Sequence, residues 1–137
     1  QCHVLREEAM MYYHRYLGLF VLEEYTGVAR DTARNLRLMD LCSQFAMEEQ
    51  DRLILEQYRP YLTMMNARAL ASIAFDAKQY DEALKVVERG LESIHEFFAR
   101  FGQEQLFAQA NEVKVLKRFA RDIRRKAEGV MRQARVL

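Results

Sequence analysis

A shortage of turn-forming residues constrains the fold of this chain more than any other feature of its sequence. One proline and five glycines serve all 137 residues, whereas a sandwich or barrel of many strands needs frequent turns built from such residues. Leucine and alanine, both good helix formers, each occur 16 times. Half of the residues are hydrophobic and 30% are charged, which excludes a disordered chain. The sequence therefore predicts an all-α fold, in a single helical domain over residues 1–137.

Apolar residues recur at intervals of three and four, which is the spacing of an amphipathic helix. This spacing predicts a helical hairpin over about 3–45, interrupted near Thr26-Gly27, and a second hairpin over about 48–101. Pro60 predicts a kink or a break just before it, because proline removes a helical hydrogen bond and crowds the preceding turn. Gly102 is expected to cap the second hairpin in a left-handed conformation. A last helix is expected over about 111–135, after a segment that holds at most a short helix.

Small and large apolar residues alternate along the segment from Met64 to His95. Ala71, Ala83 and Gly90 alternate with larger apolar residues, and Tyr80 is followed by Asp-Glu-Ala-Leu at the start of the second helix. This pattern resembles one tetratricopeptide repeat. The resemblance implies antiparallel hairpins of the α-α superhelix type, closed by a C-terminal capping helix.

A weaker copy of the same pattern surrounds Tyr25, with Arg15 and Asn35 where the family has an apolar and a small residue. Tyr25 precedes Tyr80 by 55 residues, and repeats of this family follow one another every 34 residues. We therefore expect two hairpins with elongated helices and not a regular array.

The chain as a whole is also similar to the helical region of uncharacterised bacterial proteins that carry a UvrB/UvrC-type hairpin further on. The similarity includes the run from Leu55 to Leu62 and the run from Met64 to Arg68. The hairpin itself is not in this sequence, so a role in nucleotide excision is not implied. Because Gln1 stands where an initiator methionine would be, we expect a fragment or a processed form.

The repeat-like pattern predicts a non-catalytic scaffold that binds a protein or a peptide. By the positional pattern of the family, the groove face of the helix after Pro60 would carry a charged arginine and an apolar anchor. The predicted groove residues are Met65, Arg68, Ala69, Ser72, Phe75 and Asp76.

The first helix holds more large side chains than one buried stripe can use. Two hairpins and a cap form fewer layers than the three or more repeats that a self-sufficient solenoid usually needs. We therefore expect a homodimer that covers the remaining apolar edge. Its predicted face is Met10, Tyr13, Leu17 and Phe20.

Positive charge is concentrated at the C-terminal end. Residues 112–137 hold nine lysines and arginines but only three acids, although the net charge of the chain is +1. This strip has three interpretations: a solvated capping face, the nucleic-acid-binding surface of an accessory domain, or a helix that lies on a membrane surface. The candidate phosphate contacts are Lys117, Arg118, Arg121, Arg124 and Arg125.

Catalytic and metal-binding motifs are not found in the sequence. Glu92 and His95 have the Glu-x-x-His spacing of di-iron bundles, but such sites need a second copy and further carboxylates. Cys42 lies in an apolar stretch without a base beside it, and no glycine-rich phosphate loop occurs. We therefore expect no enzyme activity, no cofactor and no metal. Two cysteines and the lack of a long apolar run favour a cytoplasmic location without membrane attachment.

Overall fold

The helices of the chain begin and end close to the residues that their sequence signals indicate. The computed structural model describes residues 24–45 and 48–136, and in these ranges it contains helices and turns but no strand. The elements in chain order are α2 (Tyr25–Gln44), α3 (Glu49–Glu56), α4 (Arg59–Asp76), α5 (Tyr80–Arg100), a 3-10 helix η1 (Glu104–Gln109) and α6 (Asn111–Val136). The all-α prediction is confirmed for this part of the chain.

Pro60 separates α3 from α4, as predicted. It lies in the first turn of α4, where a missing N–H costs nothing because the first backbone donors of a helix have no partner within it. The boundary predicted near Thr26-Gly27 lies two residues earlier, because α2 begins at Tyr25 after a non-helical Glu24 and both residues belong to its first turn. One glycine near a helix end costs only about 1 kcal/mol relative to alanine, which neighbouring helical turns can offset.

The two long helices of the second hairpin end in the same way. Gly102 follows α5 with φ of 67°, as predicted, and the N–H of Gln103 donates to the carbonyl of Phe98 at 2.8 Å. After α4, Lys78 adopts φ of 63°, and the N–H of Gln79 donates to Ala74 at 2.8 Å. Both are Schellman caps. Only the cap at Gly102 could be predicted from the sequence, because glycine favours the left-handed conformation. Lysine adopts this conformation at an energetic cost, so Lys78 gives no such signal.

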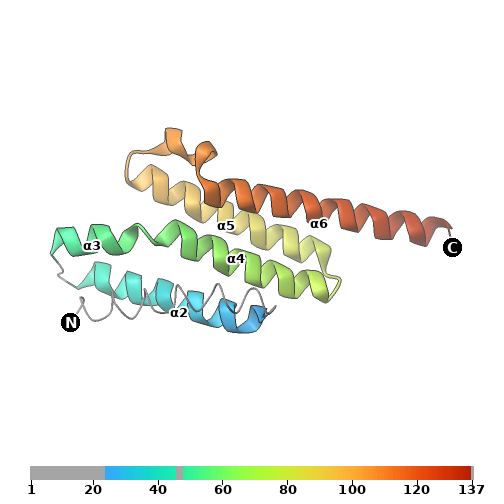
Figure 1. Ribbon diagram of the computed structural model, residues 1–137, viewed down its shortest axis with the longest axis horizontal. Coiled ribbons are helices and arrows are strands. Elements are labelled where there is room, and N and C mark those ends of the chain that lie inside the picture. Colours follow the sequence, from blue (N-terminus) through green and yellow to red (C-terminus); the bar gives the residue numbers. More distant parts are fainter. Residues whose placement is uncertain (1–23, 46–47, 137) are drawn as a thin grey trace.

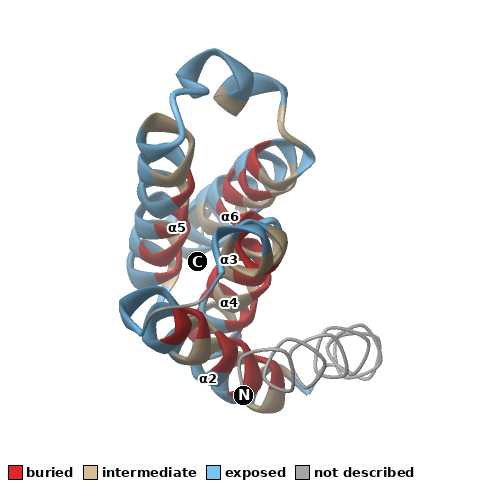
Figure 2. Cartoon of the chain, turned by 90° about the vertical axis from the view of Figure 1, so that its left-hand side faces the viewer, coloured by how far each residue is buried: buried red, intermediate tan, exposed pale blue. Residues whose placement is uncertain are grey.

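α4 is the central helix of the fold. It packs against α2, α5 and α6, and Figure 1 shows α2, α4 and α5 running side by side with α6 above α5. Figure 2 shows that the buried residues of these helices face one another. The core includes Met39, Leu62, Val87, Ile94, Leu116 and Ile123, all 2% exposed or less.

The small residues of the second hairpin lie where its helices meet. Ala71 and Ala83 are completely buried, and Gly90 is buried on α5. A Cβ atom built on Gly90 would lie 2.7 Å from the Cβ of Ala67. The close approach of α4 and α5 thus depends on the absence of a side chain at residue 90.

α6 extends beyond the other helices at the C-terminal end (Figure 1). Its first half is anchored by Val113, Leu116, Ala120 and Ile123, which are buried. Further along, Val130 and Met131 are 38% and 58% exposed. The prediction of a C-terminal helix over about 111–135 is therefore confirmed, but only its first half covers the core. None of the helices in the described ranges is long and apolar enough to cross a membrane.

Candidate binding site

A cleft of about 530 Å³ opens between α2 and α5, with α4 as its floor. We call it the α4 cleft. Leu70 lies on the floor and is 42% exposed, while Leu36 of α2 and Val86 and Phe97 of α5 add apolar walls. The volume falls within the range typical of ligand sites.

Charged groups line the same cleft. α5 contributes Arg89, Glu96 and Arg100, and Asp40 of α2 faces Arg59 of α4. Three arginines and two acids thus stand around an apolar floor. These charged side chains beside apolar ones suit binding by charge and by apolar contact.

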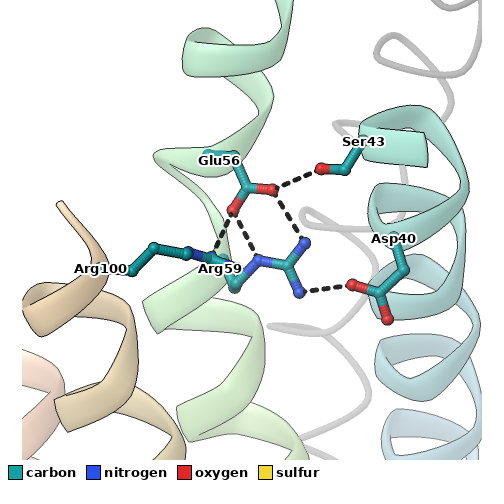
Figure 3. Close-up of polar contacts among 5 residues, drawn as sticks. All are labelled: Asp40, Ser43, Glu56, Arg59 and Arg100. Atoms are coloured by element: carbon teal, nitrogen blue, oxygen red, sulfur yellow. Dashed lines mark hydrogen bonds and ion pairs between the residues drawn. The ribbon is translucent and has the colours of Figure 1, made fainter. Parts of the chain in front are cut away.

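A buried carboxylate, Glu56, organises one end of the cleft (Figure 3). The Nε of Arg59 donates to its Oε2 at 2.6 Å and the Nη2 donates to its Oε1 at 2.9 Å. The hydroxyl of Ser43 on α2 also donates to Oε1, at 3.2 Å, and Arg100 on α5 reaches Oε2 at 3.4 Å. The Nη1 of Arg59 in turn donates to Asp40 at 2.9 Å. This network joins α2, α3, α4 and α5.

The network sets the protonation behaviour of its two central groups. Burial by itself would raise the pKa of Glu56, but the hydrogen bonds and charge of Arg59, with Ser43 and Arg100, outweigh it and lower that pKa below its ordinary value. The hydrogen bond with Glu56 likewise raises the pKa of Arg59, against the effect of burial. Glu56 is therefore ionised at neutral pH.

The lowered pKa of Glu56 predicts a loss of stability in acid. The unfolded chain binds a proton at this carboxyl more readily than the folded chain, so the free energy of unfolding rises with pH in this window. The contribution of Glu56 is present above about pH 5, where the unfolded carboxyl is ionised, and is lost as the pH falls through the lowered folded value.

Urea denaturation at a series of pH values measures this effect. In the variant Glu56→Gln the free energy of unfolding should fall less steeply than in the wild type below about pH 5. Parallel pH profiles for the two proteins would contradict an ionised, stabilising Glu56.

A second polar contact ties α2 to α4 beside the cleft. The side-chain amide of Asn66 donates to the hydroxyl of Thr32 at 3.0 Å and to the carbonyl of Ala29 at 3.2 Å. Thr32 donates to the carbonyl of Val28 at 2.6 Å. Asn35, at a position where the repeat pattern has a small residue, is completely buried in the same helix. Polar side chains thus form part of the contact surface of α2.

The residues predicted to line a peptide groove lie on the other side of α4. At 100° per residue, Met65, Arg68 and Ser72 point about 100–160° away from Asn66 and Leu70 on the cleft floor. Met65 and Ser72 are 3% and 7% exposed, so both contribute to the core and little of either side chain is open to a peptide.

The remaining predicted groove residues differ in their surroundings. Arg68 is half-buried, with its guanidinium 6.0 Å from the ring centre of Phe119 on α6. Phe75 meets Tyr80 edge to face, with ring centres 5.4 Å apart. Ala69 is completely buried, and Asp76 is exposed. The packing of α6 against α4 explains why this face contributes to the core.

The five predicted phosphate contacts on α6 are all exposed. Lys117 lies 5.8 Å from the ring centre of Phe107. The predicted dimer face, Met10, Tyr13, Leu17 and Phe20, lies outside the described residues.

The other candidate groups of the sequence stand apart from the cleft. His95 is exposed, and its ring meets Phe107 edge-on with centres 5.0 Å apart. Within 24–45 and 48–136, no three His, Cys, Asp or Glu side chains lie close enough to hold a metal ion. Cys42 is 2% exposed.

Comparisons with protein-family models, with curated proteins and with solved structures found no match to this chain. The chemistry of the α4 cleft and of α6 is therefore the guide to function.

Proposed function

We propose that this protein is a non-catalytic interaction scaffold and that the α4 cleft binds an amphipathic helix of a protein partner. The proposal rests on the exposure of Leu70. It is a large apolar side chain, 42% exposed, on the floor of a cleft formed by three helices. An apolar anchor of a partner would cover this leucine and remove its exposed apolar surface from water, which favours binding.

The length of the cleft fits a short helix. From Arg59 to Leu70 its floor follows α4 for about 16 Å, or three helical turns. A helix that lies in a groove binds through apolar anchors three, four and seven residues apart, which span about 10 Å and therefore fit within this floor. The partner would thus complete a packing arrangement in which α2 and α5 form the walls.

The charges of the cleft favour acidic residues beside those anchors. Arg89 and Arg100 have side chains that are 63% and 58% exposed. Arg89 pairs with the half-exposed Glu82 at 3.1 Å, and Arg100 reaches Glu56 at the longer distance of 3.4 Å. Because opposite charges guide association and fix register, a partner with glutamate or aspartate on the flanks of its apolar stripe is the best match.

The resemblance of the second hairpin to a tetratricopeptide repeat supports the same function. Its small residues are buried between α4 and α5, and helical-repeat proteins use extended concave surfaces for binding. The cleft proposed here nevertheless involves a different face of α4 from the one that the repeat pattern indicates.

A library of helical peptides displayed on phage, selected against the full chain, tests the proposal. Selected peptides should carry an apolar stripe with acidic flanks. Their affinity, measured by fluorescence anisotropy, should fall at least about tenfold for Leu70→Asp, because the peptide would then bury an unpaired carboxylate.

Leu106→Asp is the matched control. Leu106 lies on η1, away from the cleft, and is 41% exposed, so the substitution changes the surface by the same chemistry. It should leave peptide affinity unchanged. Peptides that bind Leu70→Asp as tightly as the wild type would contradict the assignment of the cleft.

A further inference from the structure

A line of positive charge follows one face of α6. At 100° per residue, the side chains of six basic residues fall within a sector about 80° wide, and Glu128 is the acid within it. We call these six residues the basic stripe. They are Lys114, Lys117, Arg121, Arg124, Arg132 and Arg135.

All six side chains of the basic stripe are exposed. In the part of the chain that the structure describes, none of them forms an ion pair. Their charge is therefore available to an external anion. From Lys114 to Arg135 the stripe is about 32 Å long, which is close to one turn of B-form DNA.

We propose that the basic stripe binds the phosphate backbone of double-stranded nucleic acid without regard to sequence. This site is separate from the α4 cleft and does not depend on the peptide-binding proposal. Each lysine or arginine that neutralises a phosphate releases a counterion, and this release supplies the affinity of non-specific binding.

A duplex fits the surface better than a single strand does. Single-stranded nucleic acid is held largely by bases that stack on exposed aromatic rings. Phe119, the aromatic residue of α6, is half-buried with Arg68 above its ring. Phe107 of η1 lies beside Lys117, but it is half-buried too and meets the ring of His95 edge-on. The stripe thus offers charge without a stacking platform.

A duplex also fits better than a membrane surface. A helix that lies on a bilayer inserts its apolar face between the lipid headgroups. In the first half of α6 that face is buried against the core through Val113, Leu116, Ala120 and Ile123, so it cannot insert. The stripe lies on an adjacent face that is open along the whole helix.

Fluorescence anisotropy with a labelled duplex of about 20 base pairs tests the proposal, starting at about 50 mM salt, where phosphate contacts are strong. For the full chain, the logarithm of the association constant should fall linearly with the logarithm of the salt concentration, with a slope of about −5 for six contacts. Unlabelled duplexes of different sequence should compete equally.

A triple variant removes three charges of the stripe: Lys117→Gln, Arg121→Gln and Arg124→Gln. Its salt dependence should be less steep by about 3, and its affinity for the duplex should fall at least about 100-fold at low salt. The matched control is Arg37→Gln, Lys85→Gln, Lys126→Gln, which removes the same charge from exposed residues outside the stripe. For the control variant, the association constant should depend on salt nearly as steeply as it does for the wild type. Circular dichroism melts establish that both variants fold.

Two results would overturn the proposal. One is the absence of duplex binding by the wild type at low salt; binding to phosphatidylserine vesicles that is lost in the stripe variant would then identify the stripe as a membrane surface. The other is an equal change of slope in the stripe variant and the control.

Discussion

Replacing Glu56 by glutamine is expected to lower the free energy of unfolding by about 3 kcal/mol at neutral pH. The glutamine side chain has nearly the same size, so the loss would come from charge and hydrogen bonding and not from a cavity. The side chains of Glu56 and Arg59 are only 7% and 15% exposed. Without the carboxylate, the guanidinium of Arg59 would remain largely buried with Asp40 as its acidic partner, and an incompletely paired buried charge is strongly destabilising.

Glu82→Gln is the control for this substitution. Glu82 accepts a hydrogen bond from Arg89 at 3.1 Å, but both side chains are about half exposed or more. Such surface pairs contribute about 1 kcal/mol or less. In urea denaturation, Glu56→Gln should therefore lose clearly more free energy of unfolding than Glu82→Gln. Equal losses in the two variants would contradict a buried role for Glu56.

A double variant distinguishes loss of charge pairing from a general disturbance of the site. Glu56→Gln combined with Arg59→Met removes the buried cation as well as its partner. Because the unpaired charge is the main cost, the double variant should be more stable than Glu56→Gln alone. If the double variant loses as much free energy of unfolding as the two single variants together, the two residues act independently.

Gly90→Ala is expected to lower the free energy of unfolding by about 1–3 kcal/mol, although alanine is the better helix former. The added Cβ would lie 2.7 Å from the Cβ of Ala67 and 3.4 Å from Cδ1 of Leu116. The Cβ of Ala67 is fixed to its backbone, so α4 and α5 would have to separate. The lost packing outweighs the gain in helix propensity of about 1 kcal/mol.

Gly129→Ala provides the matched control within another helix. Apart from the adjoining turns of α6 itself, no atom lies within 4 Å of a Cβ built at this position, so the substitution should raise stability by up to about 1 kcal/mol. Thermal and urea unfolding measure both variants. Adding Ala67→Gly to Gly90→Ala should recover part of the loss, because it removes the atom that the new Cβ meets. A Gly90→Ala protein as stable as the wild type would contradict the close helix approach.

The sequence by itself determined the helical class and most helix boundaries, because these depend on local chemistry. Scarce glycine and proline exclude a fold rich in turns, Pro60 stops one helix and starts the next, and Gly102 provides a left-handed cap. The small residues of the second hairpin also indicated where two helices approach. Each of these signals acts within a few residues of the chain or repeats with the helical period.

Tertiary structure alone decided which face of α4 is open. Met65 and Ser72 looked like groove residues from their spacing, but they are buried, whereas Leu70 lies exposed in the cleft. Glu56 and Arg59 are three residues apart, which indicates a helical ion pair, yet their burial and their contacts with Ser43 and Arg100 depend on four helices meeting. The orientation of packed helices sets which polar and apolar side chains lose water, and no local pattern encodes that choice.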